Sequence, residues 1–154
     1  IQTGEPDLAP RWKELWAGIA VIAVALFLIM GSEQNGYSVH WEPFRAKEFD
    51  AALGSAPLLV EFTADWCPNC KVLERTVLTS TNLEQWQKRY GLRMIKVDLS
   101  RNNIPGQALL ERLGSASIPV VALFPAGEEK NRPLVLRDLF GKAALEEALR
   151  RITP

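Results

Sequence analysis

One short segment decides how the chain is interpreted: Phe62-Thr63-Ala64-Asp65-Trp66-Cys67-Pro68-Asn69-Cys70-Lys71. It holds both of the 2 cysteines in the 154 residues. An apolar run, residues 58–60, precedes it, and a segment of helical periodicity follows it. A Cys-x-x-Cys pair between a predicted strand and a predicted helix indicates a redox-active dithiol.

The spacing of the two cysteines assigns a different task to each. If a helix begins at Cys67, the unpaired backbone N–H groups and the positive end of the helix dipole favour the thiolate there. Cys67 is therefore the predicted nucleophile. Cys70 lies one turn further along the same face, where it closes the disulfide and releases the partner as the resolving sulfur. Pro68 is compatible with a first helical turn.

Two other roles for the cysteines are less consistent with the sequence. A structural zinc site needs four ligands, and beyond the cysteines the chain has only His40 to offer. An inert structural disulfide is possible in an oxidising compartment, but a bridge that closes so short a loop constrains the unfolded chain little. We therefore expect no metal and a redox-active pair.

The residues around the pair carry a family resemblance. Ala64-Asp65-Trp66-Cys67, with Cys70-Lys71, Glu74 and the later Ile118-Pro119, resembles a thioredoxin-fold active site. Within that superfamily, it is most similar to the C-terminal domain of DsbD-like membrane thiol:disulfide interchange proteins, over about residues 41–154. The resemblance implies a cis-proline at Pro119 and dithiol exchange without a soluble cofactor. The backbone of Ile118 would then pair with an extended partner segment.

The N-terminal part predicts a membrane anchor. Residues 15–32 carry no charge and just reach the length of a transmembrane helix, with Trp12 and Trp16 placed as an interfacial belt. A signal peptide would need a small-residue cleavage site, and a buried core helix would show a polar face. Arg11 and Lys13 precede the span, so the positive-inside rule places the cysteine domain outside the cytoplasm.

The predicted domains are an N-terminal flank (1–14), a transmembrane helix (15–32), a linker (33–40) and a thioredoxin-like domain (41–154). His40, at the end of the linker, is expected to be solvated or packed. The expected strands are residues 39–44, 58–63, 92–99, 120–124 and 134–139. The expected helices are residues 47–53, 67–80, 83–90, 107–113 and 142–151. This order predicts an α/β thioredoxin fold, a mixed central sheet flanked by helices, preceded by the membrane helix.

Five residues near the cysteines have individual expectations. Glu61 interrupts a buried strand, so its carboxyl should be hard to ionise, and it is a candidate proton relay to Cys70. Glu74 shares a helix face with both sulfurs and should raise their pKa values. A solvated charge remains an alternative for both. Trp66 is expected to offer a flat contact to partners or to pack. Lys71 and Lys96 are expected to be surface charges.

Together these features predict a membrane-anchored protein-disulfide reductase. The 18 basic and 18 acidic residues cancel, which gives no indication of nucleic acid as a partner. By resemblance, a membrane dithiol domain supplies electrons, an extracytoplasmic disulfide-bearing protein receives them, and the site is the periplasmic face of a bacterial inner membrane. The alternatives are a disulfide-donating oxidase or isomerase, a tethered thioredoxin that reduces apocytochrome c, and a non-catalytic binding module.

Overall fold

The computed structural model describes residues 39–153. Among them, no helix has both the length and the apolar character needed to cross a bilayer. The membrane helix predicted over residues 15–32 and most of the predicted linker lie outside the described range, so those expectations stay predictions.

A five-stranded sheet organises the described part of the chain, in the order β1-β3-β2-β4-β5. The strands are β1 (Trp41–Pro43), β2 (Leu58–Thr63), β3 (Arg93–Asp98), β4 (Val120–Phe124) and β5 (Leu134–Arg137). β3 runs parallel to β1 and β2, whereas β4 is antiparallel to both β2 and β5. The mixed sheet confirms the predicted thioredoxin-type architecture.

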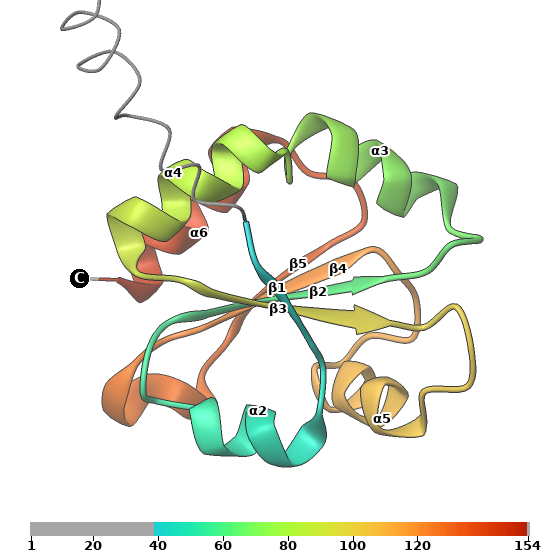
Figure 1. Ribbon diagram of the computed structural model, residues 1–154, viewed down its shortest axis with the longest axis horizontal. Coiled ribbons are helices and arrows are strands. Elements are labelled where there is room, and N and C mark those ends of the chain that lie inside the picture. Colours follow the sequence, from blue (N-terminus) through green and yellow to red (C-terminus); the bar gives the residue numbers. More distant parts are fainter. Residues whose placement is uncertain (1–38, 154) are drawn as a thin grey trace, which may run out of the picture. The chain divides into compact units, whose positions relative to one another are not determined.

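Helices cover both faces of this sheet (Figure 1). The helices are α2 (Ala46–Ala52), α3 (Pro68–Thr76), α4 (Ser80–Tyr90), α5 (Ile104–Arg112) and α6 (Lys142–Ile152), with a 3-10 helix η1 (Gly127–Asn131). On one face, Leu73 of α3, Leu83 of α4 and Leu149 of α6 share a core with Leu59 of β2. On the other face, α2 and α5 pack against alternate residues of the same strands.

The central strand is buried completely, because helices lie over both of its faces. All six residues of β2 are buried, and the continuous apolar run in the sequence predicts this correctly. Alternation along the strand sends Leu59 and Glu61 toward the α3 side and Val60 and Phe62 toward the α5 side. A charged side chain is therefore directed into the core beneath α3.

Two predicted helix boundaries are wrong for local reasons. The expected helix over residues 67–80 ends at Thr76, and a new helix begins at Ser80 rather than at residue 83. Thr79 caps this second helix by accepting the backbone N–H of Asn82, while the Asn82 side chain donates to the Val77 carbonyl. Capping at Thr79 therefore sets the start of the second helix, which periodicity alone placed three residues too late.

The starts and ends of two other elements also differ from the expectation. α5 begins at Ile104, not at residue 107, because the Asn103 side chain accepts the Gly106 N–H as an N-cap. β5 ends at Arg137, not at residue 139, because Asp138 adopts a positive φ of 60° that extended backbone does not permit. The start of α5 and the end of β5 both lie at the end of the sheet where the cysteines are.

Candidate active site

The two cysteines form a disulfide at the beginning of α3. Cys67 is the N-cap residue, and its sulfur accepts the backbone N–H of Cys70 at 3.2 Å. Pro68 follows in the first turn, where it has no intrahelical hydrogen bond to lose. This amide and the positive end of the helix favour negative charge on the Cys67 sulfur once the disulfide is reduced.

Both sulfurs are set into the protein surface rather than projecting from it. Cys67 is 4% exposed and Cys70 is 1% exposed, and both pack against Ala64, Leu99 and Ile118. Cys67 keeps slightly more exposed surface than Cys70. A partner disulfide has to be brought against this surface to reach it.

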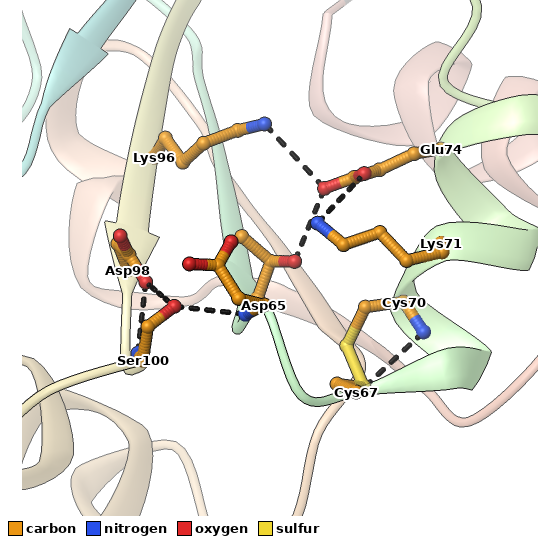
Figure 2. The surroundings of a disulfide bond; sticks show 9 residues. Asp65, Cys67, Cys70, Lys71, Glu74, Lys96, Asp98 and Ser100 are labelled. Atoms are coloured by element: carbon orange, nitrogen blue, oxygen red, sulfur yellow. Dashed lines mark hydrogen bonds and ion pairs between the residues drawn. A yellow bond between two sulfur atoms is a disulfide. The ribbon is translucent and has the colours of Figure 1, made fainter.

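A group of charged and polar side chains, here called the acid–lysine cluster, lies under α3. Its members are Glu61, Thr63, Lys71, Glu74 and Lys96. Lys96 Nζ lies 3.3 Å from Glu61 Oε2 and 3.5 Å from Glu74 Oε1, so one ammonium group bridges two carboxylates. Glu74 also accepts hydrogen bonds from Lys71 Nζ at 3.2 Å and Thr63 Oγ1 at 3.1 Å. Figure 2 shows Glu74 turned toward both lysines.

Glu61 is the titratable group of this cluster near neutral pH. Its side chain is almost completely buried, and this burial raises its pKa from 4.5 to about 7, against the opposing charge of Lys96. The Glu74 carboxylate contributes to this rise in the Glu61 pKa. Although Lys96 is close, Glu61 Oε2 accepts no aligned hydrogen bond from the described residues. The carboxyl can therefore gain or lose a proton at physiological pH.

Glu74 is in the opposite electrostatic situation. Burial raises its pKa, but the hydrogen bond from Lys71, the charge of Lys96 and the hydrogen bond from Thr63 together hold the pKa below its usual value. Two lysines thus offset part of the negative charge that was expected to act on the thiols. The effect of Glu74 on the cysteine pKa values stays a prediction.

A second set of contacts fixes the loop that carries Asp65 and Trp66. The Asp65 N–H donates to Ser100 Oγ at 2.8 Å, and Ser100 in turn donates to Asp98, whose pKa is lowered by hydrogen bonds from the Ser100 hydroxyl and N–H (Figure 2). Asn103 Nδ2 donates to the Asp98 carbonyl, which links α5 to the same loop. The end of β3 thereby holds the segment before Cys67 in place.

A pocket of about 430 Å³, here called the α5 pocket, opens beside the disulfide. Trp66 and Ile118 line it together with residues of α5 and the following loop. The Trp66 side chain is 66% exposed, and the Ile118–Pro119 peptide bond is cis. The structure therefore brings together the three residues predicted to contact partners, while their role in binding stays a prediction.

Some site residues were not recognised from the sequence. Lys96 was expected to be an ordinary surface charge, but it lies opposite Glu61 in the β2–β3 register and is only partly exposed. Lys71 likewise contacts Glu74 instead of standing alone. Ser100 carried no recognisable signal, because its partner is a backbone amide 35 residues away. His40 is exposed, as expected.

A disulfide at the start of a helix, beside a cis-proline on a mixed sheet, defines a thiol:disulfide oxidoreductase site of the thioredoxin type. A family model described as thioredoxin-like matches residues 44–126, more than half of the chain. The chain belongs to the thioredoxin-like family. It is 32% identical over 93 residues to a thioredoxin of Chlamydia caviae, covering 60% of this chain and 82% of that protein.

Within the family, the chain is related to the C-terminal domain of DsbD. It is 34% identical over 110 residues to the thiol:disulfide interchange protein DsbD 1 of Pseudomonas aeruginosa, covering 68% of this chain and 18% of that protein. The oxidised C-terminal domain of Neisseria meningitidis DsbD shares the fold, with a TM-score of 0.51, 20% identity, and coverage of 70% of this chain and 96% of that one. The chain thus spans less than a fifth of the length of the Pseudomonas relative.

Proposed function

We propose that this chain is a protein-disulfide reductase in which Cys67 and Cys70 pass electrons to disulfide-bearing partner proteins. The observation that carries the proposal is the position of Cys67, which caps α3 and receives the Cys70 amide on its sulfur. That position stabilises a nucleophilic thiolate, while the deeper Cys70 stays close enough to resolve the reaction. The named relatives, thioredoxin and the DsbD proteins, support the same chemistry.

The reaction takes two exchanges. The Cys67 thiolate attacks one sulfur of the partner disulfide; an S–S bond forms between the two proteins, and the second partner sulfur leaves as a thiolate. Cys70 then attacks Cys67, which closes the intramolecular disulfide and releases the reduced partner. Two electrons have moved to the partner, and the Cys67–Cys70 pair has been oxidised. A second dithiol must reduce the pair before the next cycle.

Glu61 is proposed to accept the proton of Cys70 before the second exchange. A resolving thiol must lose its proton to attack, and a base with a pKa of about 7 is suited to taking it at neutral pH. Glu61 is connected through Lys96 to Glu74, which lies one turn after Cys70 on α3. Glu74 is proposed to restrain the thiols through its remaining charge.

The setting of the reaction is proposed from the DsbD relatives and the N-terminal sequence. Residues 15–32 anchor the chain in a bacterial inner membrane, and the thioredoxin-like domain faces the periplasm. A membrane dithiol domain supplies the electrons, and an extracytoplasmic protein or domain receives them. Apocytochrome c is the alternative substrate.

Trapping the mixed disulfide tests the proposal. Reduced Cys70→Ser protein should accumulate a covalent adduct with a disulfide-bonded peptide, because the resolving sulfur is missing. The matched Cys67→Ser protein should form little adduct, since its remaining thiol is more buried and lacks the cap position. Adducts would be counted by non-reducing electrophoresis and mass spectrometry. Equal trapping by both variants would contradict the assigned roles.

One observation favours a disulfide donor as the second candidate. The amide on Cys67 stabilises the reduced pair, and a stabilised reduced form makes a dithiol pair more oxidising. The negative charges of Glu61 and Glu74 act in the other direction. The reduction potential, which sums these effects, distinguishes the two directions of electron flow.

A further inference from the structure

The α5 pocket is lined by apolar and polar side chains and by one acidic side chain. Its apolar surface comes from Trp66, Leu99, Leu110 and Ile118, and Glu111 is the one charged side chain among the described residues that line it. At about 430 Å³, the pocket lies in the size range of protein sites that enclose a small ligand or a single long side chain. The polar residues Gln107, Ser115 and Ser117 also line it, so it is a recess of mixed polarity with one acidic side chain.

The walls of this pocket are held in position by hydrogen bonds from outside it. On the α5 side, Arg137 Nε donates to Ser115 Oγ at 2.7 Å and Arg137 Nη2 donates to the Leu113 carbonyl at 2.6 Å. On the opposite side, the Asp65 N–H bonded to Ser100 fixes the loop that carries Trp66. A pocket with braced walls binds a ligand without first paying to order them.

The charge of Glu111 is uncompensated within the described part of the chain. Its side chain is exposed, and neither a salt bridge nor a side-chain hydrogen bond is found for it among residues 39–153. The guanidinium of Arg137 is bonded to Ser115 and to the Leu113 carbonyl, and Arg137 is not among the residues that line the pocket. The acidic side chain is thus available to an external cation.

We propose that the α5 pocket binds a lysine or arginine side chain of the partner, adjacent in sequence to the disulfide that Cys67 attacks. The methylene groups of such a side chain would lie on the apolar surface, and its cationic end would pair with Glu111. Trp66 offers an aromatic face to the same cation. Because Ile118 lines the pocket and also packs against the cluster that contains both cysteines, a residue bound there would hold the partner's cysteine within reach.

This pocket selects among partners and does not carry out the exchange. An acidic side chain at the same position of a partner would meet Glu111 with like charge, so the pocket rejects as well as attracts. The substrate class is accordingly a disulfide flanked by a basic residue. The inference depends on the proposed function only for the identity of the partner, because binding to the pocket does not need the thiols.

The test uses the full chain and three synthetic peptides with one internal disulfide, identical except that arginine, norleucine or glutamate precedes the first cysteine. The reduced chain should convert them to dithiols with rate constants in the order arginine, norleucine, glutamate. Glu111→Gln should slow the arginine peptide about three- to fivefold, the size of one partly exposed ion pair, and leave the norleucine peptide unchanged. Glu111→Lys should reverse the order of the charged peptides.

Glu128→Gln is the matched control, since it removes the same charge from an exposed residue of η1, beyond the opposite end of β4. It should change none of the three rates. Equal rates for the three peptides, or a uniform decrease with Glu111→Gln, would overturn the proposal.

Binding without chemistry separates this inference from the proposed function. Peptides with both cysteines replaced by serine would be titrated against the oxidised chain by fluorescence anisotropy. Tighter binding of the arginine form that is lost in Glu111→Gln supports the pocket even if no peptide is reduced, an outcome that would overturn only the reductase proposal. Exchange that proceeds with no preference in either assay overturns the pocket alone.

Discussion

The two sides of the disulfide differ in burial and charge. Under α3, Lys96 joins two carboxylates inside the protein, and one of them, Glu61, is almost completely buried. Beside α5, the surface is an open pocket of apolar and polar side chains next to the exposed Trp66. Buried charge acts strongly on a neighbouring thiol because water screens it poorly, whereas an exposed, partly apolar recess suits contact with another protein. The cluster under α3 is therefore suited to controlling the reactivity of the thiols, and the pocket beside α5 to selecting the partner.

The largest expected effect concerns the buried acid. Because the folded pKa of Glu61, about 7, lies above the value of 4.5 for a free carboxyl, the folded chain keeps this proton at pH values where the unfolded chain has lost it. Its contribution to stability is complete below pH 4.5 and is lost as the pH rises to about 7, a decrease of about 3 kcal/mol. Glu61→Gln should abolish this decrease.

Urea unfolding of the oxidised chain at pH 5 and pH 8 measures this effect. Glu42, Glu74 and Asp98 have lowered pKa values, so the stability they contribute is lost only as the pH falls below about 4.5 and does not disturb the comparison. Glu128→Gln, an exposed acid at the other end of the molecule, should keep the parental pH dependence. An unchanged dependence in Glu61→Gln would show that another group is responsible.

Removing the bridging lysine should have the next largest effect. Lys96→Met leaves Glu61 without its compensating charge, which should lower the free energy of unfolding by about 2 kcal/mol at pH 8. The loss should be smaller at pH 5, where Glu61 is protonated, and should there reflect the contacts of Lys96 with Glu74 and with the Trp41 ring. The pH-dependent part should disappear in the Glu61→Gln background.

Lys71→Met is the control for this prediction. Lys71 pairs with the same Glu74 but has no ion pair with Glu61, so its loss should cost about 0.5 kcal/mol, as for a partly exposed surface pair. If both lysine variants lose the same stability at both pH values, Lys96 does not compensate the buried acid.

The smallest effect on stability is expected on the pocket side. Trp66→Ala should change the free energy of unfolding by about 0.5 kcal/mol or less, because the side chain is 66% exposed. It should nevertheless slow exchange with a disulfide peptide severalfold, since Trp66 lines the pocket. Trp86→Ala, which removes a buried tryptophan of α4, should instead cost about 3 to 5 kcal/mol. A large loss of stability in Trp66→Ala would identify Trp66 as a packing residue.

The sequence was most informative where a residue pattern is compatible with few structures or functions. Two cysteines after a buried strand predict the redox pair, and the apolar run before them predicts β2. Periodicity predicts every helix of the described range except the short η1. Boundaries set by caps, as at Thr79 and Asn103, were missed because several polar residues nearby were equally able to cap. Local patterns thus locate elements better than they locate element ends.

The site was only half predictable, and the missing half has a common cause. Glu61 and Glu74 could be identified from their positions relative to the cysteines. Lys96, which joins them, comes from β3, and the sequences of β2 and β3 do not determine how the two strands align. The α5 pocket likewise combines Trp66 with residues from Leu99 to Ile118, far along the chain. Contacts between distant segments can be identified only once the fold is known, whereas contacts within one segment follow from its residue spacing.

The equilibrium reduction potential of the full chain tests the reductase assignment most directly. The chain would be equilibrated in glutathione and dithiothreitol buffers of graded potential, and the fraction with free thiols would be counted after alkylation. We expect a value near that of thioredoxin, about −270 mV, because the carboxylates of the acid–lysine cluster oppose the thiolate that the α3 terminus favours. A value near −120 mV, at the oxidising extreme, would contradict it and make the chain a disulfide donor.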